Sequence, residues 1–107
     1  MSQEILLALS TFPDTETAHR ISSQLVNEKF VACANILPGA ESIYCWKGKL
    51  EKGNETLVFF KLSEDRQSAF QDKLKSLHPY EVPEIILVPI SSGLPEYLSW
   101  VAENCAG

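Results

Sequence analysis

The segment HPYEVPEI, residues 78–85, places an imidazole beside two carboxylates, and these groups could together bind a metal ion. A neutral His78 with Glu81 and Glu84 is an adequate ligand set for copper or zinc. The same spacing also fits a structural histidine that is hydrogen-bonded to the backbone or to a neighbouring subunit. Because a proline follows both His78 and Val82, the segment is predicted to be a stiff, extended link that leads into a strand.

Two further residues could add a charged contact near this segment. Glu84 opens the last predicted strand, and Lys61 closes a strand that is expected to lie close to it. We therefore expect an ion pair or hydrogen bond between Lys61 and Glu84. The alternative is a surface pair that contributes little to stability.

Four large aromatic side chains are candidates for a contact between subunits. Each of these side chains is largely apolar but carries one polar group, a hydroxyl or an indole N–H. Such side chains suit a partly hydrated interface better than a ligand-binding pocket. The residues predicted to anchor such an interface are Tyr44, Trp46, Tyr97 and Trp100.

No catalytic motif is present in the sequence, and we expect a protein that is not an enzyme. There is no phosphate-binding glycine loop, nucleophile elbow or metalloprotease helix. Ser10 and Thr11 follow an apolar run, but no nearby histidine could serve as their base. The three cysteines match neither a disulfide framework nor a zinc motif, so they are predicted to be reduced thiols.

The charge balance makes nucleic acid a poor partner. Fourteen acidic residues outnumber nine basic ones, and no run of lysine or arginine offers a stripe for phosphates. The first residues, MSQEILLALSTFP, form neither a signal peptide nor a membrane-spanning segment. We therefore expect a cytoplasmic protein with no membrane partner, and the 107 residues predict a single domain over 1–107.

The pattern of apolar residues predicts alternating strands and helices, with turn signals at Pro38–Gly39 and at KGNE, residues 52–55. Around Pro38 two interpretations stay open, a separate third strand with a bent start or one long interrupted hairpin. The predicted order is a strand over 4–9, a helix from Asp14 to Glu28, strands over 30–37, 41–51 and 56–62, a helix from Ser63 to Leu77, a strand over 84–90 and a helix over 94–104.

This order predicts an α+β fold, the ferredoxin-like βαββαβ sandwich with an extended β-hairpin and an extra C-terminal helix. In that fold two helices cover one face of the sheet, and the other face must meet water or another subunit. The region from Glu41 to Leu62 has apolar or aromatic residues at consecutive positions, so both of its faces favour burial. We therefore expect a homo-oligomer.

Several segments resemble the CutA divalent-cation-tolerance family: STFPD, ACANILPGAESIYCWKGKLE, HPYEVPEI and YLSW, in the family's order and spacing. The resemblance spans nearly the whole chain. It implies a homotrimer that is similar to the PII signalling proteins and a role in the response to metal ions, with weak binding of copper or another divalent cation and no obligatory cofactor.

The resemblance also implies where copper would bind. Some bacterial members combine a cysteine at the end of the first strand with two adjacent histidines before the PY pair. This chain has Ser10 and Leu77 at two of those places, so only His78 carries over. A hydroxyl and an isobutyl group do not replace a thiolate and an imidazole toward copper.

An alternative function has no metal role. In it, clefts near His78, Lys61, Tyr80, Glu81 and Glu84 bind a small anionic metabolite, and the trimer senses that ligand as the PII proteins do. A stable trimer that offers its surface to another protein is a third possibility.

Overall fold

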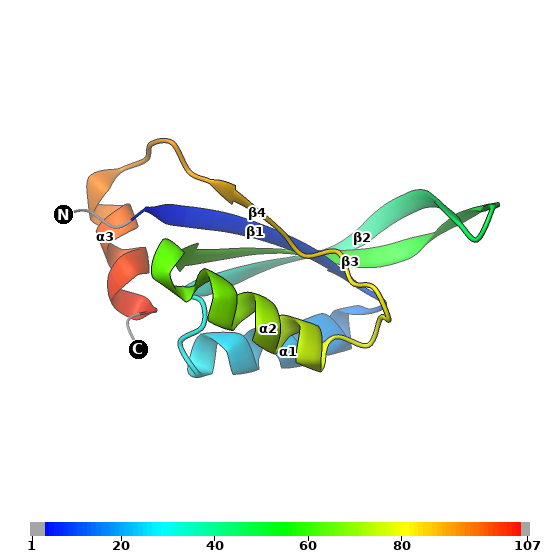
Figure 1. The fold of residues 1–107 in the computed structure, drawn as a ribbon, viewed down its shortest axis with the longest axis horizontal. Coiled ribbons are helices and arrows are strands. Elements are labelled where there is room, and N and C mark those ends of the chain that lie inside the picture. Colours follow the sequence, from blue (N-terminus) through cyan, green and yellow to red (C-terminus); the bar gives the residue numbers. More distant parts are fainter. Residues whose placement is uncertain (1–3, 106–107) are drawn as a thin grey trace.

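Within the described residues, the chain forms four strands and three α-helices in the predicted βαββαβ order, followed by the extra helix (Figure 1). The computed structural model describes residues 4–105, so both ends of the predicted 1–107 domain lie outside the described residues. A 3₁₀ turn, η1, at Glu64–Arg66 precedes the second helix. The elements are β1 Ile5–Phe12, α1 Thr15–Asn27, β2 Cys33–Trp46, β3 Lys49–Ser63, α2 Gln67–Leu77, β4 Ile86–Pro89 and α3 Pro95–Asn104.

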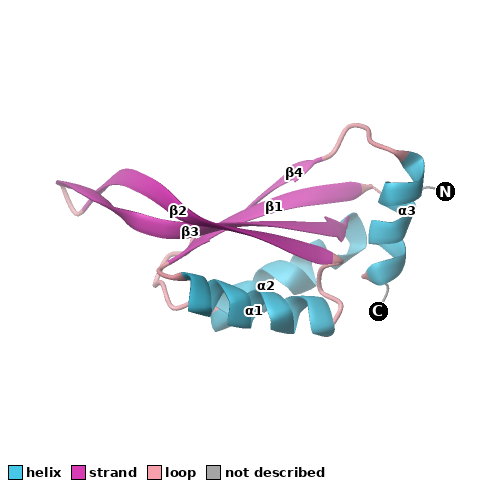
Figure 2. Cartoon of the chain, turned by 180° about the vertical axis from the view of Figure 1, so that it is seen from behind, coloured by secondary structure: helices cyan, strands magenta, loops and turns pink. Residues whose placement is uncertain are grey.

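The strands make one antiparallel sheet in the order β2-β3-β1-β4, and α1 and α2 cover one of its faces (Figure 2). Alternate residues of β1 and β3 point to these helices and build the core. Ala8, Phe12 and Phe60 are fully buried there, against Ile21 of α1 and Phe70 of α2. The strand order and the covered face confirm the ferredoxin-like sandwich.

The opposite face of the sheet carries mainly apolar side chains that no helix of the described chain covers fully. Residues directly opposite one another in an antiparallel pair share a face. Leu9 pairs with Phe59 on one side and with Ile86 on the other, and Leu7 pairs with Val88. Ile86 is 48% exposed and Val88 44% exposed. We call these five residues the open face.

A long arm projects from the sheet and stretches the molecule to 48 Å along its longest axis, against 25 and 22 Å along the others (Figure 1). The arm consists of residues 40–46 of β2 and 49–55 of β3, paired from Ala40–Glu55 to Trp46–Lys49. The register shifts between Leu37 and Ala40, where Gly39 has a φ of +85°. Of the two interpretations around Pro38, the long interrupted hairpin is the correct one.

The turn predicted at KGNE was wrong. Gly53 and Asn54 lie inside β3 and pair with Ser42 and Glu41. The chain reverses instead at Lys47–Gly48, where both residues have positive φ, as a two-residue hairpin turn requires. Both segments contain a glycine, and only the pairing of the two strands decides which of them turns.

The helix predictions were correct in position and only partly correct in their caps. Asp14 caps α1 as expected, because its carboxylate accepts a hydrogen bond of 2.7 Å from the backbone N–H of Thr17. Ser63 was expected to cap the second helix, but its hydroxyl donates to the Asp65 carboxylate instead. A 3₁₀ turn therefore leads into α2, which ends at Leu77 before Pro79 as predicted.

The turn assignment can be tested with two glycine substitutions. Gly48→Ala is expected to lower the free energy of unfolding by about 1 kcal/mol, because an L-residue is strained at a φ of +80°. Gly53→Ala is the matched control and is expected to leave stability unchanged or raise it, since no atom beyond its two neighbours in the chain lies within 4 Å of the added methyl group. Urea denaturation at one protomer concentration measures both, and equal losses would contradict the assignment.

Candidate ligand-binding site

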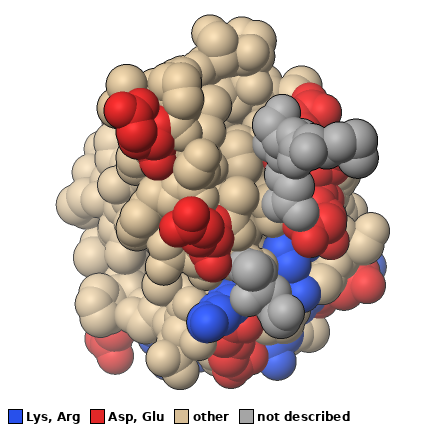
Figure 3. Space-filling view, turned by 90° about the vertical axis from the view of Figure 1, so that its left-hand side faces the viewer, with Lys and Arg blue, Asp and Glu red and all other residues tan. Residues whose placement is uncertain are grey.

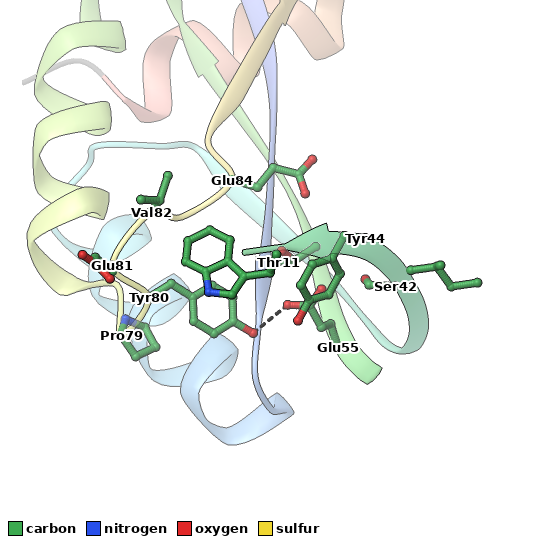
Figure 4. A pocket seen from close by; sticks show the side chains of 11 residues that line it. Thr11, Ser42, Tyr44, Glu55, Pro79, Tyr80, Glu81, Val82 and Glu84 are labelled. Atoms are coloured by element: carbon green, nitrogen blue, oxygen red, sulfur yellow. Dashed lines mark hydrogen bonds between the residues drawn. The ribbon is translucent and has the colours of Figure 1, made fainter. Parts of the chain in front are cut away.

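A cavity of about 670 Å³ lies where the arm joins the body of the molecule (Figure 4). We call it the arm-base pocket. Four parts of the chain meet there: the end of β1, the arm residues of β2, Glu55 at the base of the arm on β3, and the link between α2 and β4. Its lining residues are Thr11, Ser42, Ile43, Tyr44, Trp46, Glu55, Pro79, Tyr80, Glu81, Val82 and Glu84.

His78 holds the link against the end of β1. The residue is 8% exposed, and its ring stacks on the ring of Phe12, with ring centroids 4.7 Å apart. Its Nε2 lies 2.8 Å from the carbonyl oxygen of Thr11, and its Nδ1 lies 3.2 Å from the backbone nitrogen of Tyr80. Because a backbone N–H can only donate, Nδ1 accepts and the proton sits on Nε2.

This geometry makes His78 a structural residue in the described subunit. Both ring nitrogens are engaged, so neither offers a lone pair to a metal ion. Burial lowers the pKa of His78, while the bond to Thr11 and the charge of Glu55 act in the opposite direction. Of the two interpretations of His78, the hydrogen-bonded histidine is the one that this arrangement favours.

The residues at the other two positions of the family's copper site do not supply metal ligands either. Ser10 is fully buried on the helix side of β1, and its hydroxyl has no hydrogen-bond partner within the described residues. Leu77 packs against the core. Within residues 4–105, no three His, Cys, Asp or Glu side chains come together as a metal site. The residues at these places therefore do not fit a preformed copper centre in one subunit.

A short hydrogen bond ties the link to the arm. The hydroxyl of Tyr80 donates to Glu55 Oε2 at 2.6 Å, drawn as the dashed line in Figure 4. Burial, followed by the hydrogen bond and the negative charge of Glu55, raises the pKa of Tyr80. Tyr80 also lies next to His78, with ring centroids 4.8 Å apart. The contacts that run from Thr11 through His78 and Tyr80 to Glu55 thus connect β1, the link and β3.

Three of the four residues predicted for a ligand cleft line the pocket: Tyr80, Glu81 and Glu84. Lys61 does not. It pairs with Leu7, four residues before Thr11 on β1, so its backbone is about 13 Å from the pocket. Its ammonium group donates to Asn35 Oδ1 at 2.6 Å.

The expected contact between Lys61 and Glu84 was also wrong. The sheet order places β1 between β3, which carries Lys61, and β4, which begins two residues after Glu84, so the two side chains are not on neighbouring parts of the sheet. Among the described residues, the one ion pair joins Lys73 to Glu28. Without Lys61, the lining of the pocket holds three carboxylates and no basic side chain.

Sequence reasoning missed Glu55, Thr11 and Ser42 as pocket residues. Glu55 stands in KGNE, which was interpreted as a turn, and Thr11 was considered only as a nucleophile. Glu55 faces Ala40 across the arm and reaches Tyr80, 25 residues further along the chain. No local signal marks these residues, because their places depend on the register of β2 and β3.

The four predicted interface aromatics fall at two ends of the molecule. Tyr44 and Trp46 lie on the arm, 49% and 44% exposed, and both line the pocket. Tyr97 and Trp100 stack on each other on α3, with ring centroids 5.8 Å apart, at the far end of the sheet. That end of the surface is mostly uncharged, with separate acidic groups over it and basic groups in its lower part (Figure 3). Their contact with another subunit stays a prediction.

Comparison with known proteins agrees with the fold. The family model described as CutA1 divalent ion tolerance protein matches residues 6–104. The chain belongs to this family. The CutA divalent-cation tolerance protein of Salmonella newport strain SL254 is 43% identical over 98 residues, which cover 92% of this chain and 85% of that protein.

Solved structures of CutA proteins superpose closely on this chain. The protein from Xylella fastidiosa is 42% identical with a TM-score of 0.93, covering 95% of this chain and 98% of its own. The protein from Thermus thermophilus, described as a divalent cation tolerance protein, is 40% identical with a TM-score of 0.92, and covers 95% and 99%. The predicted family and fold are therefore confirmed.

The location in the cell stays a prediction. Within residues 4–105, no helix is both long and apolar enough to cross a membrane. A relative from Archaeoglobus fulgidus, 33% identical with a TM-score of 0.91 and covering 95% of this chain and 99% of its own, is described as periplasmic.

The buried imidazole predicts a pH dependence. Below the ordinary pKa of 6.5, the unfolded chain takes up a proton that the folded protein binds only at lower pH. The free energy of unfolding is therefore expected to fall as the pH drops below about 6.5 and to level off once folded His78 is protonated. Thermal unfolding followed from neutral to mildly acidic pH measures it.

His78→Gln is the control for this prediction. It removes the titrating group, whereas His19 and the carboxylates remain in both proteins. The difference in stability between the two proteins should then shrink as the pH falls. A difference that stays constant over this range would contradict the assignment.

Proposed function

We propose that the protein works as a homotrimer in the response to divalent metal ions, as a binding protein without a catalytic step, in the cytoplasm. The observation that carries the proposal is the open face, in a chain of the CutA1 family. The number three comes from the family resemblance.

The open face supports assembly because its apolar residues are contiguous. Phe59 and Leu9 lie at its centre, and Ile86 and Val88 extend it to the edge strand β4. Contiguous apolar surface of this kind marks a protein interface in soluble proteins. The arm adds exposed apolar side chains, among them Leu50 at 79% exposure, so a partner would cover both regions.

Divalent cations would meet carboxylates on this chain. Glu81 and Glu84 are exposed at the arm-base pocket, whereas the His78 imidazole is buried and hydrogen-bonded. Carboxylate oxygens suit hard cations such as Mg²⁺, Ca²⁺ and Mn²⁺ better than they suit copper. We therefore propose weak contact with divalent cations at this acidic surface, without a resident metal.

A second candidate function is favoured by the arm-base pocket. A cavity of about 670 Å³ falls within the usual range for sites that bind small molecules. In this candidate, the trimer is a PII-like module that binds a small ligand at the base of each arm. Three carboxylates and no cation line the pocket, so the small anion considered at first does not match it.

The assembly is tested by light scattering coupled to size-exclusion chromatography at micromolar protomer concentration. We expect three times the 11.9 kDa mass of one chain. Val88→Glu places a charge within the open face and should abolish the trimer, since an unpaired charge is costly in an apolar interface. Gln71→Glu adds the same charge on the exposed side of α2, and this variant should remain a trimer. A monomeric wild type would overturn the proposal.

The contact with metal is tested by calorimetric titration of metal-free protein with Cu²⁺ and with Mn²⁺. Wild type and His78→Gln should give equal heats, because the imidazole nitrogens are already engaged. The double variant Glu81→Gln, Glu84→Gln should bind both ions more weakly. Loss of copper binding in His78→Gln alone would contradict this assignment.

A further inference from the structure

We infer that the arm-base pocket binds a small organic cation, a primary alkylammonium ion, with its charge toward the carboxylates and its aliphatic part along the aromatic walls. The inference names the ligand class for the second candidate function and rests on it. Every lining residue belongs to the described subunit, and several of them, including Ile43, Tyr44 and Trp46, lie on the arm that the proposed trimer would bring against a partner.

Charge is the first argument. Glu55, Glu81 and Glu84 line the pocket, and no lysine, arginine or histidine does. Glu81 and Glu84 are exposed and form no ion pair within the described part of the chain. Among residues 4–105, the Glu55 carboxylate accepts a hydrogen bond only from the uncharged Tyr80 hydroxyl, and no cationic side chain pairs with it. A cationic ligand would therefore complement the pocket, and an anion would be repelled.

The aromatic walls are the second argument. Tyr44, Trp46 and Tyr80 line the same cavity, and the faces of such rings attract ammonium groups. The chain already shows this chemistry at the pocket margin, where the ammonium group of Lys47 lies 6.0 Å from the centroid of Trp46. Lys47 is not a lining residue, so this contact does not fill the cavity.

The same walls argue against a bare metal ion as the ligand of the cavity. A metal ion needs several oxygen or nitrogen atoms that converge within a short distance. No three metal-ligating side chains converge in residues 4–105, and aromatic rings occupy the space between the carboxylates (Figure 4). An organic cation instead makes one or two ionic contacts and covers the rings with its own apolar surface.

The apolar lining and the size of the cavity favour a ligand that carries an alkyl chain. Ile43, Pro79 and Val82 complete the wall, and 670 Å³ accommodates a small metabolite rather than a single ion. The wall is also held in place before a ligand binds. Tyr80 is fixed by Glu55 and by its contact with His78, and two prolines stiffen the link, which limits the entropy lost on binding.

The probe is n-pentylamine, compared with 1-pentanol and with pentanoate at the same pH and ionic strength. The amine should raise the melting temperature in a saturable way and give a calorimetric binding isotherm, while the alcohol and the acid should do neither. MgCl₂ at equal ionic strength controls for general screening of the acidic surface.

Two variants locate the site. Glu84→Gln should weaken binding of the amine about two- to fivefold, as expected for a partly exposed ion pair. Trp46→Leu keeps an apolar side chain and removes the ring, and should weaken it about two- to thirtyfold. Glu103→Gln, which removes an exposed charge on α3, should bind like the wild type. Circular dichroism and the oligomeric mass establish that each variant is folded.

Absence of a saturable isotherm with n-pentylamine would overturn the inference, as would equal affinities in Glu84→Gln and Glu103→Gln. If pentanoate or pentanol binds in its place, the ligand class is wrong but the pocket still binds small molecules. If none of the three binds, the second candidate function fails as well. The homotrimer is tested separately by its mass.

Discussion

Among the described residues, a sheet with two apolar faces, only one of which the helices cover fully, is the constraint on which the rest of this structure depends. The helices α1 and α2 bury Ala8, Phe12 and Phe60, which supplies the core of a small domain. The open face and the arm keep apolar side chains that one chain cannot cover by itself. Assembly with further copies would let both faces of the sheet contribute to stability.

The link between α2 and β4 connects this fold to its pocket. Pro79 ends the helix geometry, and the neutral imidazole of His78 then fastens the link to β1 by stacking on Phe12 and bonding to Thr11. Tyr80 follows and reaches Glu55 on the arm. A residue that resembled a metal ligand in the sequence thus positions the carboxylates and rings that line the pocket.

The lining of the pocket has the composition on which the proposed cation site rests, and it lacks the ligands that copper prefers. Thiolate and free imidazole are absent from its lining, whereas carboxylates and aromatic rings are present. This composition agrees with a family named for tolerance to divalent cations, and it also allows an organic cation to compete for the same surface. The net charge of −5 favours cations in general.

The sequence by itself determined the features that depend on neighbouring residues. The cap at Asp14, the helical spacing behind it and the stop before Pro79 are local, and α1 and α2 lie where they were predicted. The order of strands and helices likewise follows from local patterns and leads to the fold class. Three residues of the pocket, Tyr80, Glu81 and Glu84, could be named because they share one short segment.

Only the tertiary structure decided which distant residues meet. The turn lies at Lys47–Gly48 and not at Gly53, because pairing along the whole arm outweighs one local turn signal. Lys61 is separated from the pocket because its register on β3 places it opposite Leu7, four residues before Thr11 on β1. The state of His78 depends on Thr11, 67 residues away, since a side chain's protonation and free lone pairs follow from what surrounds it in space.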